Sequence, residues 1–249
     1  ALDAEHIPAV YFSAIAALPT VFFGNSRVVQ RQDHEPVHVL ILGNAGGTIG
    51  NLMQRFFPGR ELDITGVELD PAVTALTTAY FPPPPRPYPV IHADSRTFVR
   101  QSDARYDIIV VDAYTNQLTI PPHLVTKEFY ALLREHLKPG GIVVANVNAP
   151  SRDSPLLQTI AQTIADVFPH VIEGSAGAWN HLLIAAVEPI DPHVKSDVRF
   201  FLESVRLVSR DRSVRIFTDD WAPLELMTDF EIFESLHSIQ SRRNVREER

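Results

Sequence analysis

A glycine turn between two apolar runs is the feature that most constrains this chain. Residues 37–42 form an apolar, β-branched run, and the sequence GNAGGT follows at 43–48. A helix-compatible stretch leads to a second apolar run, which ends in Glu68. Strand, glycine turn, helix, strand and acid, in that order, are the plan of a nucleotide-binding βαβ unit. We expect the glycines to let backbone approach a ligand, and Glu68 to accept hydrogen bonds from ribose hydroxyls.

The turn departs from the strict dinucleotide pattern G-x-G-x-x-G, because position 45 is alanine. This departure disfavours a ligand with a pyrophosphate, such as NAD or FAD. A looser glycine turn followed by an acid suits an adenosyl group without a pyrophosphate, such as S-adenosylmethionine or a relative. The alternative is that Gly46 and Gly47 only permit close packing of helix against strand.

The bulk composition limits the classes of function. The chain has 249 residues, 45% of them hydrophobic and 21% charged, which fits one large α/β domain with small appendages. Its net charge of −8 argues against nucleic-acid binding and is compatible with a cationic small substrate. There is no cysteine and no metal-binding histidine spacing, so we expect no metal.

Targeting signals are also missing from the sequence. No run reaches the length of a membrane span and no signal peptide is visible, so we expect a cytoplasmic protein without a membrane span in this chain. The chain begins at Ala1 without methionine, which would fit a soluble part excised from a longer, membrane-fused protein.

The alternation of strand and helix patterns predicts three parts: an N-terminal segment (1–36), a Rossmann-like domain (37–190) and a C-terminal helical extension (191–249). Strands that are apolar throughout are typical of a parallel sheet covered on both faces. Asp107, at the start of one strand, is expected to be exposed. Strands are expected at 37–42, 62–68, 90–92, 106–111, 142–147, 171–173 and 181–187, the last two as an antiparallel pair, and helices at 49–57, 71–80, 95–101, 124–137, 154–168, 194–208 and 224–238.

Three acids follow predicted strands directly. Glu68, Asp94 and Asp112 should therefore lie at the carboxyl edge of the sheet, where open α/β sheets bind ligands. From ligand shape we expect Glu68 to hold the ribose, Asp94 to meet an adenine amino group and Asp112 to face the reacting end. Asp94 could equally cap the helix that starts at Ser95.

Several motifs together resemble the spermidine synthase (polyamine aminopropyltransferase) family, in particular its divergent branch that is often fused to membrane segments. They are GNAGGT (43–48), VELDP (67–71), ADSRTF (93–98), YDIIVVDA (106–113) and LKPGG (137–141). The segment YFSAIAALP (11–19) resembles that family's Y-H-E-M-x-x-H-x-P segment, and TDDWAPLE (218–225) resembles the ending of the divergent branch.

The resemblance implies an S-adenosylmethionine-dependent methyltransferase fold with a mostly parallel seven-stranded sheet and helices on both faces. It implies a homodimer in polyamine biosynthesis that transfers the aminopropyl group of decarboxylated S-adenosylmethionine to an amine such as putrescine. Asp112 would serve the attacking amine. The residues expected to bind the adenosyl co-substrate are Gly43, Asn44, Gly46, Gly47, Glu68, Leu69, Asp94, Ser95 and Asp112, and those expected to meet the amine are Tyr114, Asp219 and Asp220.

The chain departs from the family pattern where the aminopropyl chain and a diamine would bind. The acid of the family's glycine loop falls on Gly46, and the second acid of its D-x-x-D motif falls on Thr115. In the segment that resembles Y-H-E-M-x-x-H-x-P, Phe12 and Ser13 stand in place of the first histidine and the glutamate, and Ala17 stands in place of the second histidine. Asp219, Asp220 and Glu225 could replace the lost charges, or could simply cap the helix that begins at Leu224.

Three functions are therefore compatible with the sequence. The first is an aminopropyltransferase. The second is an S-adenosylmethionine-dependent methyltransferase, because Gly46 removes an acid that would repel a methionine carboxylate. The third is a non-catalytic domain that binds an adenosyl metabolite, which the loss of diamine residues favours.

Overall fold

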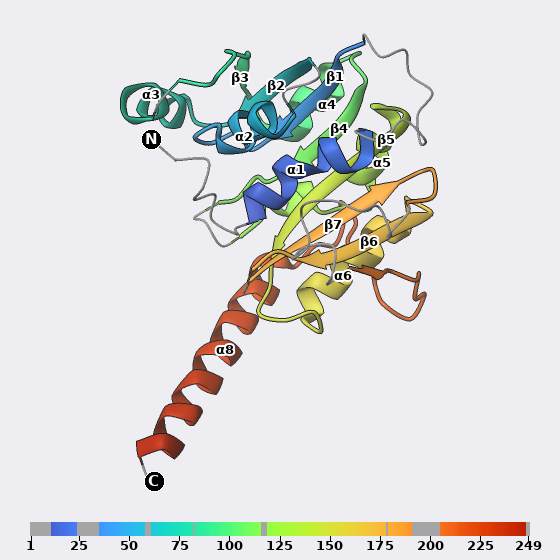
Figure 1. Ribbon diagram of the computed structural model, residues 1–249. Coiled ribbons are helices and arrows are strands. Elements are labelled where there is room, and N and C mark those ends of the chain that lie inside the picture. Colours follow the sequence, from blue (N-terminus) through green and yellow to red (C-terminus); the bar gives the residue numbers. More distant parts are fainter. Residues whose placement is uncertain are drawn as a thin grey trace.

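A single eight-stranded sheet with helices on both faces forms the body of the molecule in the residues described (Figure 1). The computed structural model describes residues 11–23, 35–57, 61–81, 83–115, 119–177, 179–190 and 205–247. The strand order is β3-β2-β1-β4-β5-β7-β6-β8. The strands are β1 (Val37–Leu42), β2 (Leu62–Glu68), β3 (Val90–His92), β4 (Tyr106–Val111), β5 (Leu137–Asn148), β6 (His170–Ser175), β7 (Asn180–Ala186) and β8 (Arg206–Leu207). The helices are α1 (Tyr11–Phe23), α2 (Thr48–Phe56), α3 (Pro71–Tyr80), α4 (Ser95–Gln101), the 3-10 turn η1 (Pro122–Leu124), α5 (Lys127–Glu135), α6 (Pro155–Ala165) and α8 (Leu224–Glu247).

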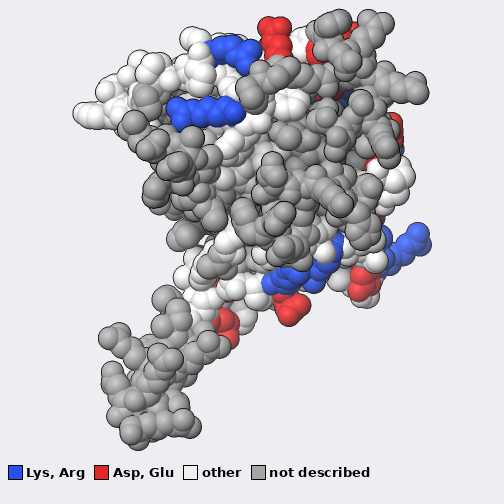
Figure 2. Space-filling model, in the orientation of Figure 1, with Lys and Arg blue, Asp and Glu red and all other residues white. Residues whose placement is uncertain are grey.

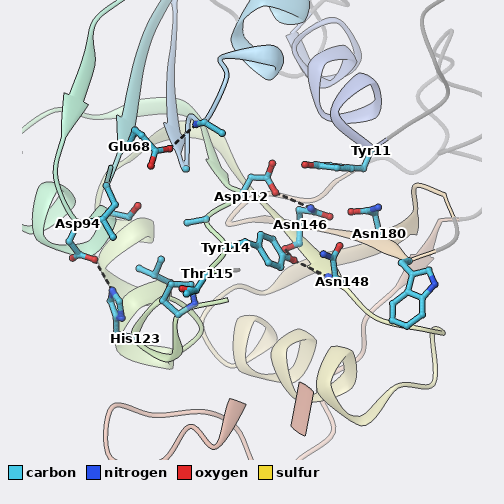
Figure 3. A pocket seen from close by; sticks show the side chains of 18 residues that line it. Tyr11, Glu68, Asp94, Asp112, Tyr114, Thr115, His123, Asn146, Asn148 and Asn180 are labelled. Carbon is cyan, nitrogen blue, oxygen red and sulfur yellow. Dashed lines mark hydrogen bonds and ion pairs between the residues drawn. The ribbon is translucent and has the colours of Figure 1, made fainter. Parts of the chain in front are cut away.

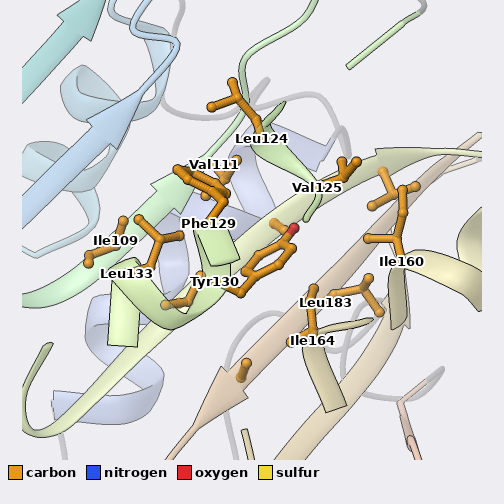
Figure 4. Packing of buried hydrophobic residues seen from close by; sticks show 14 of the residues in the cluster. Ile109, Val111, Leu124, Val125, Phe129, Tyr130, Leu133, Ile160, Ile164 and Leu183 are labelled. Carbon is orange, nitrogen blue, oxygen red and sulfur yellow. The ribbon is translucent and has the colours of Figure 1, made fainter. Parts of the chain in front are cut away.

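Strand β1 feeds two separate cores because its side chains alternate between the faces of the sheet. Val39 and Ile41 are buried with residues of α1 and α2 on one face. Leu40 and Leu42 are buried with residues of α4, α5 and α6 on the other. Figure 4 shows part of this second core, where the side chains of α5 and α6 pack against β4 and β7. A sheet covered on both faces explains why its central strands are apolar throughout.

The register of the parallel strands determines which residues meet at the carboxyl edge. Leu42 at the end of β1 is the partner of Val67 in β2 and of Val111 in β4. Val111 is in turn the partner of Ala145 in β5. The residues that follow these positions therefore emerge at the same edge, with Gly43 after β1 between Glu68 of β2 and Asp112 after β4.

The last strands run antiparallel, as the sequence predicts. β7 pairs antiparallel with both β5 and β6, and this places Asn180 opposite Asn148. The sheet gains one strand beyond the seven expected, because β8 adds to the edge of β6. Residues 206–207 were predicted to belong to a helix over 194–208. That prediction is wrong at these two residues, and its first part lies outside the described residues.

Two other boundaries differ from the prediction. The helix expected over 124–137 begins at Lys127, because the hydroxyl of Thr126 accepts a hydrogen bond from the Phe129 amide and caps the helix there. It ends at Glu135, and the strand expected at 142–147 begins earlier, at Leu137, as β5. Asp107 was expected to be exposed, but it is fully buried. Its Oδ2 accepts a hydrogen bond from the His38 amide at 2.8 Å, which compensates for the lost contact with water.

Helix α8 begins at Leu224, as predicted, but extends to Glu247 and projects away from the sheet (Figure 1). No helix in the described part of the chain is long and apolar enough to cross a membrane. On the face shown in Figure 2, the described acidic and basic side chains are interspersed.

Candidate active site

A pocket of about 590 Å³ opens at the carboxyl edge of the sheet (Figure 3). This is within the range of ~300–1,000 Å³ that is typical of small-molecule sites. Its position is where open α/β sheets bind their ligands. The pocket is lined by Tyr11, Gly43, Ala45, Glu68, Leu69, Asp94, Ser95, Asp112, Ala113, Tyr114, Thr115, Pro121, His123, Leu124, Asn146, Asn148, Trp179 and Asn180.

The turn after β1 is held close to the turn after β4. Gly43 has a φ of +88°, and a Cβ at this position would lie 2.4 Å from the carbonyl oxygen of Asp112. Only glycine allows both the backbone conformation and this approach. Ala45 also has a positive φ, of 42°, which costs an L-residue energy that glycine would not incur.

Glu68 is oriented by the backbone around it. Its Oε2 accepts a hydrogen bond from the Ala45 amide at 2.8 Å, and its Oε1 accepts one from the Asp70 amide at 3.1 Å. Each carboxylate oxygen can accept more than one hydrogen bond, so Glu68 keeps the capacity to accept from two hydroxyl groups of a ligand. The carboxylate is thus fixed at the rim of the pocket before any ligand arrives.

Asp94 performs two tasks at once. Its Oδ1 accepts a hydrogen bond from the Thr97 amide at 2.8 Å and caps α4, while its Oδ2 lies 2.7 Å from Nε2 of His123. Burial raises the pKa of Asp94, but the Thr97 amide and His123 outweigh it and hold the pKa below its usual value. Asp94 is therefore both the expected helix cap and a residue of the pocket.

Asp112 lines the pocket beside Tyr11 and Asn146 (Figure 3). The Nδ2 of Asn146 donates a hydrogen bond to Oδ1 of Asp112 at 2.9 Å, and the Tyr11 hydroxyl donates another to the same carboxylate. Burial raises the pKa of Asp112 to about 6 despite these two donors. Burial and the neighbouring Asp112 also raise the pKa of Tyr11, so its phenol stays protonated. Asp112 is thus ionised at neutral pH and is a stronger base than an ordinary carboxylate.

The hydroxyl of Tyr114 is occupied by backbone. It donates to the Asn146 carbonyl oxygen and accepts from the Asn148 amide, both at 2.9 Å. Tyr114, which the sequence predicts to meet the amine, lines the pocket while its hydroxyl holds the end of β5 in place.

Three asparagine amides complete this side of the pocket. Asn146 and Asn148 are two residues apart in β5, and Asn180 of β7 lies directly opposite Asn148, so all three belong to the same face of the sheet. Asn146 is 3% exposed, and its Oδ1 accepts no hydrogen bond from the described residues. A buried amide oxygen without a donor is a position for a donor group of a ligand.

The pocket gathers many of the predicted site residues but not all. Gly43, Glu68, Leu69, Asp94, Ser95, Asp112 and Tyr114 line it. Asn44, Gly46 and Gly47 line a second hollow of about 550 Å³ on the α3 side of the glycine turn.

Asp219 and Asp220 line neither hollow among the described residues. Asp219 forms two hydrogen bonds of 2.7 and 2.6 Å with the guanidinium of Arg96 and accepts a third, of 2.8 Å, from the Thr126 hydroxyl. Its charge is therefore used to attach the segment before α8 to α4 and α5.

Tyr11, His123 and the three asparagines line the pocket but are not among the predicted site residues. Asn146 and Asn148 had a signal, because polar residues at alternate positions near the end of an apolar strand point to one face of the carboxyl edge. Tyr11 had a signal too, as the first residue of the segment 11–19 that resembles a motif of the family. His123 had none, since it does not follow a strand directly and reaches the pocket through the tertiary fold.

The fold and the pocket define a protein of the Rossmann-like methyltransferase fold with three carboxylates in the pocket at the carboxyl edge of its sheet. Residues 22–176, more than half of the chain, match the family model of the spermine/spermidine synthase domain. The chain therefore belongs to the spermine/spermidine synthase family.

Individual relatives agree with this assignment. The chain is 39% identical over 130 residues to a protein of Bifidobacterium longum named "Probable polyamine aminopropyl transferase", covering 52% of this chain and 28% of that protein. It is 31% identical over 122 residues to a polyamine aminopropyltransferase of Vibrio vulnificus, covering 47% of this chain and 40% of that protein. The chain thus spans less than half the length of these curated relatives.

A solved structure, described as a probable spermidine synthase from Corynebacterium glutamicum, superposes with a TM-score of 0.67 at 20% identity. The match covers 86% of this chain and 81% of that one. At this identity the likeness supports the fold.

Proposed function

We propose that this protein transfers the aminopropyl group of decarboxylated S-adenosylmethionine to an amine. The observation that carries the proposal is the row of Glu68, Asp94 and Asp112 along one rim, next to the turn at Gly43. Family membership supports the same reaction, since the relatives are named for it. The predicted homodimer and the predicted cytoplasmic location stay predictions.

The pocket divides into two halves under this proposal. In the adenosyl half, Glu68 would accept from the ribose hydroxyls, and Asp94 with its partner His123 would lie toward the adenine. We call the other side the acceptor half; it consists of Tyr11, Asp112, Tyr114, Asn146, Asn148, Trp179 and Asn180.

Charge favours the decarboxylated co-substrate. The described residues that line the pocket include Glu68, Asp94 and Asp112 but no lysine or arginine. Decarboxylated S-adenosylmethionine carries two positive charges, whereas S-adenosylmethionine adds a carboxylate at the reacting end, on the side of Asp112. This argues against the methyltransferase alternative, although Gly46 offers no acid to the aminopropyl ammonium.

In the reaction, an uncharged amine nitrogen forms a bond to the carbon next to the sulfonium. The carbon–sulfur bond breaks, its electron pair goes to sulfur, and methylthioadenosine leaves as a neutral thioether. Asp112 holds the amine by an N–H group and takes up its proton, and its raised pKa makes it better suited to do so. Displacement at a sulfonium depends mainly on alignment, so positioning provides much of the rate.

The test is a transfer assay with the purified chain, decarboxylated S-adenosylmethionine and a panel of amines, with methylthioadenosine and the aminopropylated product measured by mass spectrometry. Both products should form in equal amounts. Asp112→Asn should lower kcat/KM by about 10²–10⁴, whereas Asp103→Asn at an exposed position should not change it. Binding of the co-substrate without product from any amine would favour the non-catalytic alternative.

A further inference from the structure

The acceptor half of the pocket would bind a cationic amine, yet its described residues carry little negative charge. Among its described residues, Asp112 is the one carboxylate, and the other polar groups are two phenols, one indole and three carboxamides. Tyr11 donates its hydroxyl hydrogen to Asp112, and Tyr114 uses its hydroxyl on the β5 backbone. Among the residues that the structure describes here, one ammonium group can therefore be paired with a carboxylate, and a second finds no such partner.

The three carboxamides lie beyond Asp112 as a group (Figure 3). Asn146 touches Asp112 through its Nδ2, and the cross-strand pair of Asn148 and Asn180 continues along the same face. A carboxamide offers both a donor and an acceptor but no net charge. Such a surface is suited to a hydroxyl or another neutral group that donates and accepts, and an ammonium desolvated there would lack an anionic partner.

On the basis of the proposed function, we infer that the acceptor is an amine with a single positive charge and an uncharged hydrogen-bonding group at its other end, such as an amino alcohol, rather than a diamine. Its nitrogen lies at Asp112, where it attacks and gives up its proton. Its neutral end lies against Asn146, Asn148 and Asn180. The chemistry of transfer is unchanged, because only the part of the acceptor remote from the reacting nitrogen differs.

The decisive pair of substrates is 4-aminobutan-1-ol and 1,4-diaminobutane, which differ in one terminal group. With decarboxylated S-adenosylmethionine saturating, kcat/KM for the amino alcohol should exceed that for the diamine by at least about tenfold, because the second ammonium is desolvated without an anion. A diamine that is equal or better would overturn the inference.

A charge-restoring variant tests which residues set the preference. Asn180→Asp should raise kcat/KM for the diamine relative to the amino alcohol by about tenfold or more, because it gives the second ammonium a partner. Asn180→Gln keeps the side chain neutral and should retain the preference for the amino alcohol. An Asn180→Asp variant with an unchanged ratio would show that the neutral end does not lie at this residue.

Binding separates failure of this inference from failure of the proposed function. Each amine is titrated by calorimetry into the protein saturated with methylthioadenosine, which needs no turnover. Tighter binding of the amino alcohol without any transfer would support the inference and contradict the proposed activity. Transfer to both amines with the diamine preferred would support the activity and contradict the inference.

Discussion

The protonation of Asp112 is expected to shape the pH profile of the reaction. Its pKa is raised to about 6, so the carboxylate that accepts the proton is lost as pH falls through this value. The free acceptor amine is protonated up to about pH 10. If Asp112 takes the amine proton, kcat/KM depends on ionised Asp112 and on protonated amine. It should therefore rise with pH up to about 6 and then stay level up to about 10.

The Asp112→Asn variant should lose this plateau. Without the carboxylate, reaction depends on the small fraction of free amine, and that fraction grows about tenfold per pH unit below the amine pKa. Residual kcat/KM should thus keep rising between pH 6 and 9 in steady-state assays. A wild-type profile that also rises throughout this range would contradict proton uptake by Asp112.

Ala45 provides a test of strain in the glycine turn. Its φ of 42° lies in the left-handed region, which glycine adopts freely and alanine does not. Ala45→Gly should raise the free energy of unfolding by about 0.5–1 kcal/mol, after the greater chain entropy of glycine in the unfolded state is subtracted. Denaturant titration measures this change.

The matched control for this turn is Ala104→Gly. Ala104 is exposed in a loop and has no positive φ, so glycine there should lower stability. Effects of the same sign at both positions would mean that residue 45 stores no strain.

The position of an acidic residue in the pocket could be predicted from the sequence where that residue directly follows a predicted strand. Glu68 and Asp112 follow apolar runs whose parallel pairing brings their ends to one edge, and both line the pocket. Asp219 could not be placed, because its partner Arg96 is 123 residues away in the chain. A long-range ion pair of this kind leaves no periodic pattern in the sequence.

At the scale of elements, Glu173 joins β6 to three of its neighbours. Its side chain is 1% exposed, and its carboxylate lies 2.8 Å from His181 in β7, 2.6 Å from Arg206 in β8 and 3.4 Å from Arg152 before α6. Burial raises the pKa of Glu173, but His181 and the two arginines outweigh it and hold the pKa below its ordinary value of 4.5.

Glu173→Gln should lower the free energy of unfolding by about 2 kcal/mol at neutral pH, because it removes the charge from a buried carboxylate that is hydrogen-bonded to His181 and Arg206. The depressed pKa gives stability that is fully present above pH 4.5 and is lost as pH falls through the lower pKa of the folded state. The variant should therefore lose part of the acid dependence as well.

Glu188→Gln, at an exposed position, is the control and should change stability by less than about 0.5 kcal/mol. An equal acid dependence in wild type and Glu173→Gln would contradict this role.

Elements were predictable where local signals were strong. Asp70 and Pro71 mark the start of α3, and the Asp70 side chain caps the helix as such a pair should. β8 was not predictable, because two residues carry no period, and its place depends on the edge of β6 and on Glu173. The helix predicted at Leu124 was one turn too early, since Thr126 intervenes as a cap.

At the scale of the whole molecule, net charge and pocket charge act in the same direction. The chain carries a net charge of −8, and three of its carboxylates line the pocket, where the described lining has no lysine or arginine. A co-substrate with two positive charges should be attracted over a distance as well as at the site. The overall charge was available from the sequence, whereas the absence of basic residues from this lining depends on which side chains the fold brings together.

Decarboxylated S-adenosylmethionine should therefore bind at least about tenfold more tightly than S-adenosylmethionine, because the extra carboxylate of the latter is repelled by Asp112 at the reacting end and, over a longer distance, by the other pocket acids. Calorimetry at two ionic strengths measures both the difference and its origin. The advantage should shrink as salt rises from about 0.01 M to 1 M, since the screening length falls from about 30 Å to 3 Å.

Methylthioadenosine has neither the sulfonium nor the ammonium, so its affinity should depend little on salt and provides the control. Equal or tighter binding of S-adenosylmethionine would contradict this charge argument and favour methyl transfer, because the carboxylate rim would then not discriminate between the two donors.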